Sequence, residues 1–269
     1  MLVNGELDDS ISAADRGLLY GDGVFRTLRV TGGQPLHWQR HYRKLQQDCA
    51  ALALPCPDAS LLLEELHRLI ASGTDGVAKI IVTRGAGVRG YAPPGNPIPT
   101  RILALTPCPP YPGESYTQGV KLRICDLRLS HQPRLAGVKH LNRLENVLAA
   151  AEWDDPGIAE GLLLDMGDNV IEGTRSNLFM VSGGALLTPD LSRCGVAGVQ
   201  RERVLEWAAA HGAPCRIAQF GPGELRAADE IFLVNSIIGL WPVRELLDRS
   251  WSHFPFAMQV QEWLSHAPD

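Results

Sequence analysis

The chain lacks the features that mark membrane, secreted and nucleic-acid-binding proteins. No apolar run in its 269 residues approaches the length of roughly twenty residues that a membrane span needs. The N-terminal sequence MLVNGELDDS is acidic and has neither the basic nor the apolar region of a signal peptide. Lysine and arginine are scattered and the formal net charge is −5, which disfavours nucleic acid and anionic membranes as partners. We expect a cytoplasmic protein.

Cysteine and metal-ligand patterns are also missing. The six cysteines form no CxxC pair and no dense framework, so we expect reduced and mostly buried thiols. His37 and His41 are one helical turn apart in HWQRH, but no glutamate lies between them as in HExxH. The sequence therefore predicts no metal site.

The composition is that of an ordinary globular protein, with 45% hydrophobic and 20% charged residues. Apolar periodicity predicts strands at 24–30, 77–84, 101–106, 120–125, 162–164, 178–181 and 230–234, and helices at 38–52, 60–71, 199–210 and the C-terminus. The segment 107–119, PCPPYPGESYTQG, breaks every period with proline and glycine. We therefore expect an α/β (α+β mixed) fold of two domains, 1–106 and 120–269, joined by 107–119.

One glycine motif does not have the context that its usual function requires. Residues 85–90, GAGVRG, match GxGxxG, but a dinucleotide site needs a helix to begin at this point. The next residues are YAPPGNPIP, which cannot open a helix. We interpret the segment as a flexible loop that carries Arg84, Arg89 and Tyr91 beside an active site.

Lys139 stands alone ahead of a predicted amphipathic helix. Helical spacing predicts that this helix packs on a core through Leu141, Leu144, Val147, Leu148 and Ala151. Burial disfavours the charge of a lysine and lowers its pKa, which makes the amine a better nucleophile and Schiff-base former. The alternative is a solvated lysine.

An acidic residue and a glycine-rich turn follow further along the chain. Glu172 lies at the edge of two apolar strand-like runs, and a carboxylate in such a place can serve the ring nitrogen of pyridoxal phosphate. In CGVAGVQRERV, the N–H groups of Gly198, Val199 and Gln200 begin a helix and would form a phosphate cup. A glycine turn of no special purpose is the alternative.

Five motifs in this order carry a resemblance to a known family: DRGLLYGDGVFRTLRV, RGAGVRGY, AGVKHLNRLENVLA, IEGTRSNLF and GVAGVQRERV. Together they resemble the fold-type IV pyridoxal-phosphate enzymes over nearly the whole chain. The pair KHLNRLE and RGxGxRGY is most similar to the 4-amino-4-deoxychorismate lyases of folate biosynthesis. The resemblance implies a homodimer with pyridoxal 5'-phosphate bound between the domains.

The resemblance also implies site residues. Lys139, in the larger domain, would carry the cofactor and Glu172 would serve its pyridine nitrogen. The phosphate would be held by the Gly198–Gln200 amides with help from Ser236. The family commonly has an arginine in the first helix as a phosphate clamp, where this chain has Lys44. Because lysine lacks the bidentate fork, we expect a looser grip.

Arginines distinguish the subclass. Related aminotransferases tend to have glutamate where this chain has Arg26. An arginine suits a small anionic substrate with more than one carboxylate, so we expect Arg26, Arg84 and Arg89 to bind it. Each could instead be an exposed arginine of no special role.

The implied reaction releases pyruvate from aminodeoxychorismate and leaves 4-aminobenzoate, with Lys139 as general base. Two alternatives stay open. One is a branched-chain or D-amino-acid aminotransferase on the same fold, and the other is a non-catalytic binder that has kept the fold.

Overall fold

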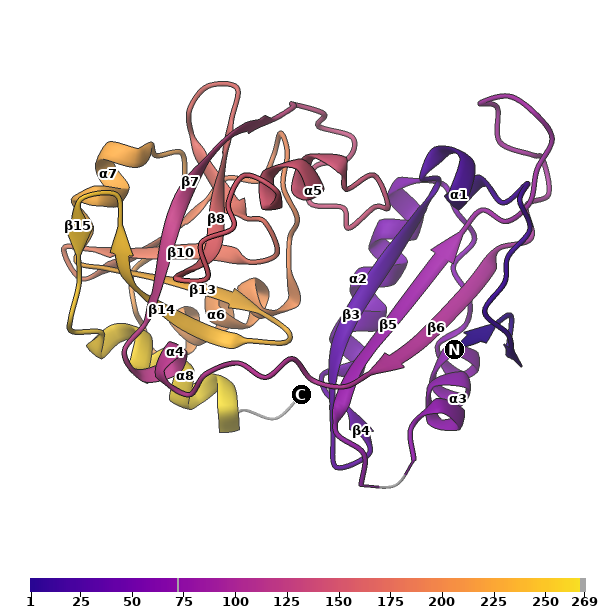
Figure 1. The fold of residues 1–269 in the computed structure, drawn as a ribbon, viewed down its shortest axis with the longest axis horizontal. Helices are drawn as coiled ribbons and strands as arrows, with labels where there is room; N and C mark the ends of the chain where they lie inside the picture. Colours follow the sequence, from indigo (N-terminus) through magenta and orange to yellow (C-terminus); the bar gives the residue numbers. More distant parts are fainter. Residues whose placement is uncertain (72, 267–269) are drawn as a thin grey trace. The chain divides into compact units, whose positions relative to one another are not determined.

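The computed structural model describes residues 1–71 and 73–266, which form two compact units (Figure 1). Unit 1 contains Met1–Pro109 together with the short segment Val138–Asn142. Unit 2 contains Pro110–Gly137 and the described residues from Arg143 onward. No helix in the described ranges is long and apolar enough to cross a membrane.

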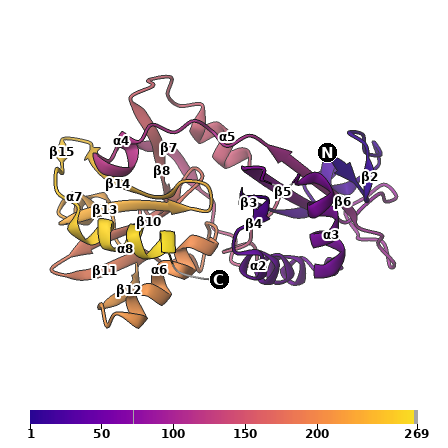
Figure 2. The ribbon, with the colours of Figure 1, turned by 90° about the horizontal axis from the view of Figure 1, so that it is seen from below.

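Unit 1 is a six-stranded antiparallel sheet with helices on one face. The strand order is β2-β1-β6-β5-β3-β4. The strands are β1 (Leu2–Val3), β2 (Glu6–Leu7), β3 (Gly23–Thr31), β4 (Gln34–Pro35), β5 (Gly76–Thr83) and β6 (Thr100–Thr106), and the helices are α1 (Arg16–Tyr20), α2 (Trp38–Ala51) and α3 (Ala59–Leu69). Figure 2 shows α2 and α3 on the same face of this sheet.

The two-residue period of β3 decides which face is buried. Its buried side chains are Val24, Arg26, Leu28 and Val30, whereas Arg29 is exposed. The apolar members of this row form one core with Leu45 of α2 and with Leu62 and Leu66 of α3. Arg26 is therefore a charged residue in an otherwise apolar row.

Unit 2 is built on a nine-stranded sheet. The order is β12-β11-β10-β13-β14-β7-β8-β9, and β15 pairs with β14. The strands are β7 (Val120–Leu129), β8 (Ile158–Asp165), β9 (Val170–Gly173), β10 (Asn177–Ser182), β11 (Ala185–Pro189), β12 (Cys215–Ala218), β13 (Glu230–Asn235), β14 (Gly239–Leu246) and β15 (Arg249–Ser250). The helices are α4 (Glu114–Thr117), α5 (Leu144–Ala150), α6 (Val199–Ala210), α7 (Pro222–Arg226) and α8 (Pro255–His266).

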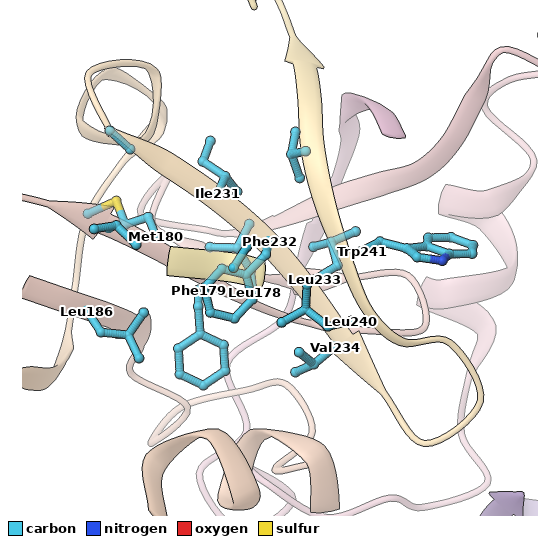
Figure 3. Packing of buried hydrophobic residues seen from close by; sticks show 14 of the residues in the cluster. Leu178, Phe179, Met180, Leu186, Ile231, Phe232, Leu233, Val234, Leu240 and Trp241 are labelled. Carbon is cyan, nitrogen blue, oxygen red and sulfur yellow. The ribbon is translucent and has the colours of Figure 1, made fainter. Parts of the chain in front are cut away.

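The core of unit 2 is aromatic at its centre. Phe179 of β10 and Phe232 of β13 are fully buried and stack with ring centroids 5.3 Å apart (Figure 3). Trp241 on the neighbouring strand β14 meets Tyr111 edge to face at 4.9 Å. The first five residues of β10 and of β13 are all buried, which explains the continuous apolar runs in these strands.

Most of the predicted elements are confirmed, with shifts of a few residues at their ends. The helices predicted at 38–52, 60–71 and 199–210 correspond to α2, α3 and α6, and the C-terminal helix is α8. The mixed α/β fold class is also confirmed. No helix follows the GAGVRG motif, whose residues lie in an irregular loop between β5 and β6.

The prediction that the helix after Lys139 packs on a core is wrong. The helix α5 begins only at Leu144, and Leu144, Val147 and Leu148 are 74%, 59% and 60% exposed. Ala149 is the buried residue of this helix. The periodic apolar stripe is real, but it faces away from the core of unit 2.

The segment that carries Lys139 differs from the expected division of the chain. We expected it in the larger C-terminal domain, but Val138–Asn142 belongs to unit 1. The reason is pairing with β3: His140 forms an antiparallel bridge with Val24, and the Leu141 N–H donates to the Gly23 carbonyl at 2.9 Å.

The row of buried side chains on β3 gives a stability prediction. Leu28→Ala should lower the free energy of unfolding by about 2–5 kcal/mol, because it leaves a cavity in the core of unit 1. Leu7→Ala is the control, since Leu7 is 81% exposed and its loss should change stability by less than about 0.5 kcal/mol. Denaturant unfolding of both variants measures the difference, and equal effects would contradict the burial described for β3.

Candidate functional site

Lys139 is held in unit 1 by its backbone. The Phe25 N–H donates to the Lys139 carbonyl at 2.9 Å, which places the lysine beside the first half of β3. The Lys139 N–H donates to Oδ2 of Asp48, at 3.2 Å, near the end of α2. Both backbone polar groups of this residue are therefore satisfied within unit 1.

The side chain of Lys139 lies over an aromatic ring. Its Nζ is 4.6 Å from the centre of the Phe25 ring, and Nζ of Lys79 on β5 is 5.0 Å from the same centre. A cation over a ring face is attracted by the ring quadrupole. Lys79 was not among the predicted site residues. The alternation of β5 was a usable signal, because Lys79 is an exposed lysine between buried Ala78 and Ile80.

Arg26 forms an ion pair inside the core of unit 1. It is 2% exposed, and its Nη2 donates to Oδ2 of Asp48 and, at 3.1 Å, to the carbonyl of Lys44. Arg26 is thus engaged with α2 rather than presented to a ligand. For this reason we do not retain it among the substrate-binding residues.

Arg84 is likewise committed within unit 1. Its Nε donates to Asp22 at 2.7 Å, and its other nitrogens donate to Asp22 and to the carbonyls of Leu52 and Ala53. Arg16, buried at 3% exposure, donates to the same Asp22 carboxylate at 2.8 Å. The two arginines hold the pKa of Asp22 below its usual value against the opposing effect of burial.

Arg89 differs from the other two arginines because its side chain is exposed. Its loop is held by Arg16, which donates to the carbonyls of Gly90 and Tyr91 at 2.9 and 2.8 Å. The exposed Tyr91 ring lies 5.4 Å from that of Tyr20. Arg89 is therefore the one of the three predicted arginines that the structure leaves available to an anion.

The two histidines of HWQRH, His37 and His41, lie at the start of α2. His41 is buried, and neither ring nitrogen has a hydrogen-bond partner among the described residues. Burial lowers the pKa of His41 to about 3, and the nearby Arg26, His37 and Lys139 act in the same direction. No cluster of metal-binding side chains occurs in the described parts of the chain.

Lys44, the predicted phosphate residue, is half-buried on α2. It lies one helical turn before Asp48, and its carbonyl accepts the hydrogen bond from Arg26. In unit 1, Arg26 therefore contacts both the Lys44 carbonyl and the Asp48 carboxylate. Asp48 in turn accepts the N–H of Lys139.

Glu172 lies on β9 in unit 2, where it is 4% exposed. Its Oε2 accepts the N–H of Val196 at 2.8 Å. Buried Arg201 is close enough to interact electrostatically with this carboxylate. Burial lowers the pKa of Arg201, and its side chain donates to the Thr188 hydroxyl and the Pro189 carbonyl. A backbone N–H and a nearby cation therefore both face this buried carboxylate.

The predicted phosphate cup lies at the start of α6 in the same unit. The Gly198 N–H is already bonded to Oδ1 of Asn177 at 3.0 Å. The N–H groups of Val199 and Gln200 lie in the first turn of the helix, where no intrahelical partner is possible. Ser236 is half-buried in the turn between β13 and β14. Lys139 belongs to unit 1, whereas Glu172, the start of α6 and Ser236 belong to unit 2.

Comparison with known proteins places the chain in one family. The family model for amino-transferase class IV matches residues 23–246. The aminodeoxychorismate lyase of Vibrio harveyi is 37% identical over 241 residues, which are 90% of this chain and 89% of that protein. A putative branched-chain-amino-acid aminotransferase of Methanocaldococcus jannaschii is 31% identical over 90% of this chain and 84% of its own length.

Comparison with solved structures also finds a similar lyase and a similar branched-chain aminotransferase. The crystal structure of 4-amino-4-deoxychorismate lyase from Pseudomonas aeruginosa is 49% identical, with a TM-score of 0.95 over 99% of this chain and 98% of that one. The branched-chain aminotransferase of Escherichia coli shares the fold at 22% identity, with a TM-score of 0.87 over 98% of this chain and 93% of that one. The chain therefore belongs to the class IV aminotransferase family.

Proposed function

We propose that this protein is a pyridoxal-phosphate-dependent lyase that converts 4-amino-4-deoxychorismate to 4-aminobenzoate and pyruvate. The observation that carries the proposal is the 49% identity to a lyase of that name over 99% of this chain. The aminotransferase relatives are more distant, at 31% identity or less among those compared.

The residues of both units fit pyridoxal 5'-phosphate. Glu172 supplies a buried carboxylate for a protonated ring nitrogen, and the first turn of α6 supplies the N–H groups of Val199 and Gln200 for a phosphate. The Gly198 N–H is bound to Asn177, so Gly198 serves the turn and its amide is not needed for the phosphate. Lys44 would add a positive charge and Ser236 a hydroxyl.

The chemistry depends chiefly on Lys139. When bound, the cofactor supplies a conjugated ring that accepts the electron pair left at C4 of the substrate. Lys139, as a neutral amine, removes the C4 proton and later returns a proton to the methylene carbon of the departing enolpyruvyl group. The C3–O bond breaks, pyruvate leaves and the ring becomes aromatic, so the protein mainly has to bind and orient.

The substrate carboxylates need cationic partners, because a desolvated carboxylate is costly without one. Arg26 and Arg84 are held by Asp48 and Asp22. We therefore propose Arg89, together with Lys79, as the cations for these carboxylates. Lys79 shares the Phe25 ring with Lys139 and is exposed on that face of the sheet of unit 1.

We further propose that the protein is a homodimer and that α5 contributes to its interface. Leu144, Val147 and Leu148 form a continuous apolar stripe on the exposed side of this helix. Such a stripe is typical of a protein–protein contact. We also propose a cytoplasmic location, since all six cysteines are free thiols.

Product analysis tests the proposed function. The purified protein, loaded with pyridoxal phosphate, is incubated with aminodeoxychorismate in the absence of any keto acid. Equal amounts of pyruvate and 4-aminobenzoate support the lyase. Amino transfer from alanine or a branched-chain amino acid without pyruvate release would show an aminotransferase, and no turnover of any substrate would show a binder.

The role of Lys139 gives the second prediction. Lys139→Ala should reduce turnover by several powers of ten, because the covalent attachment and the base are lost together. Cofactor should still bind non-covalently through its phosphate and ring contacts. The measurement is kcat together with cofactor affinity by fluorescence, and turnover within about tenfold of the parent would contradict the assignment.

The third prediction concerns the substrate carboxylates. Arg89→Met and Lys79→Met should each raise KM and lower kcat/KM. The loss should be equivalent to about 2–4 kcal/mol where the bound substrate buries the ion pair between its carboxylate and the cation. Bound cofactor should stay at the parent level. Arg216→Met, at an exposed arginine of β12, is the control and should behave like the parent. If both site variants keep parent kinetics, the carboxylates are recognised elsewhere.

The fourth prediction concerns α5. Leu148→Glu places a charge in the apolar stripe, so it should shift the protein from dimer to monomer in analytical ultracentrifugation. Met166→Glu, at a 68% exposed position outside α5, should leave the dimer intact. A parent that sediments as a monomer, or a Leu148→Glu variant that remains a dimer, would refute the role of this helix.

A further inference from the structure

Arg26 lies where the pattern of β3 requires an apolar side chain. It is 2% exposed, and its neighbours in the row, Val24 and Leu28, are fully buried. A buried guanidinium costs several kcal/mol unless an opposite charge and hydrogen bonds compensate it. Asp48 provides that charge, and the carbonyl of Lys44 accepts a second hydrogen bond at 3.1 Å.

Asp48 is also in an unusual place. It lies in the last turn of α2, where the helix dipole disfavours a carboxylate, and it is 4% exposed. Burial raises the pKa of Asp48, whereas Arg26 and the Lys139 N–H oppose that rise. A carboxylate at this end of a helix does not stabilise the helix. The structural role of Asp48 therefore lies in its contacts with Arg26 and with the Lys139 N–H.

The hydrogen bond between the Lys139 N–H and Asp48 lies next to the backbone pairing of β3 with the segment Val138–Asn142. The segment Val138–Asn142 is bonded to β3 through the Lys139 carbonyl and the Leu141 N–H. The Lys139 N–H donates to the Asp48 carboxylate and not to a carbonyl of β3. Asp48 therefore links α2 to the peptide group from which the Lys139 side chain projects.

We propose that Arg26 and Asp48 are positioning residues that fix the backbone of Lys139, and of Lys44 with it, so that the lysine amine is presented to the cofactor aldehyde. This inference rests on the proposed role of Lys139. Arg26 is joined to α2 at two points one turn apart, and Asp48 extends this connection to Lys139. Arg26 acts through these contacts and does not touch the substrate.

The test measures attachment of pyridoxal 5'-phosphate to the apo-protein. The Lys139 amine adds to the aldehyde carbon and one water is lost, which changes the absorbance; borohydride then transfers hydride to the C=N bond and fixes the adduct for peptide mapping. Arg26→Met should slow attachment at Lys139 by at least about tenfold, because small displacements of a reacting group reduce rates strongly.

Arg101→Met is the matched control. Arg101 pairs with the buried carboxylate of Glu65 at 2.7 Å in the same unit, but this pair has no contact with Lys139 among the described residues. Loss of either arginine should lower the unfolding temperature, because each leaves a buried carboxylate unpaired. Only the loss of Arg26 should slow attachment, and Arg26→Lys, which keeps the charge, should restore part of the rate.

A double variant separates stability from positioning. Arg26→Met with Asp48→Leu removes both buried charges, and such apolar replacements are often neutral or stabilising, so this variant should fold. It should still attach the cofactor slowly. Attachment at the parent rate in Arg26→Met and in the double variant would overturn the inference alone. A parent that never attaches the cofactor at Lys139 would overturn the proposed function and this inference with it.

Discussion

The hydrogen bond from the Lys139 N–H to the Asp48 carboxylate is the contact on which the proposed chemistry depends. It joins the segment Val138–Asn142 to α2 in unit 1, and Arg26 forms an ion pair with its acceptor inside an apolar core. Removing one member of such a buried pair is far more costly than replacing both. Arg26, Asp48 and Lys139 therefore link the packing of α2 on β3 to the position of the Lys139 backbone.

Local pattern was enough to predict most of the elements, and it singled out Lys139 and Glu172 as candidates for the site. The alternation of β3 and the helical periods of α2 and α6 are properties of short windows, and these elements are confirmed. Lys139 and Glu172 were identified because their chemistry is unusual in apolar surroundings. The same alternation places Arg26 in the buried row of β3, although its residue type had suggested a substrate role. Its partner Asp48 was not predictable, because that pairing depends on how α2 packs on the sheet.

The helix α5 shows what periodicity cannot decide. The stripe of Leu144, Val147 and Leu148 indicated an amphipathic helix, and a helix is present, but the stripe is exposed. Periodicity reports that one face avoids water and does not report what covers that face. Arg84 shows a similar limit of sequence patterns. Its loop resembled a substrate-binding segment, but its side-chain nitrogens donate to Asp22 and to the carbonyls of Leu52 and Ala53. Exposure, and not residue type, distinguished Arg89 from it.

The most direct test of the central claim is to identify the lysine that carries the cofactor. The parent protein is loaded with pyridoxal 5'-phosphate, reduced with borohydride and digested, and the labelled peptide is sequenced by mass spectrometry. The account predicts one label per chain, on Lys139 in the peptide that contains VKHLNR. A label on Lys44 or Lys79, or no label on a fully loaded protein, would contradict it.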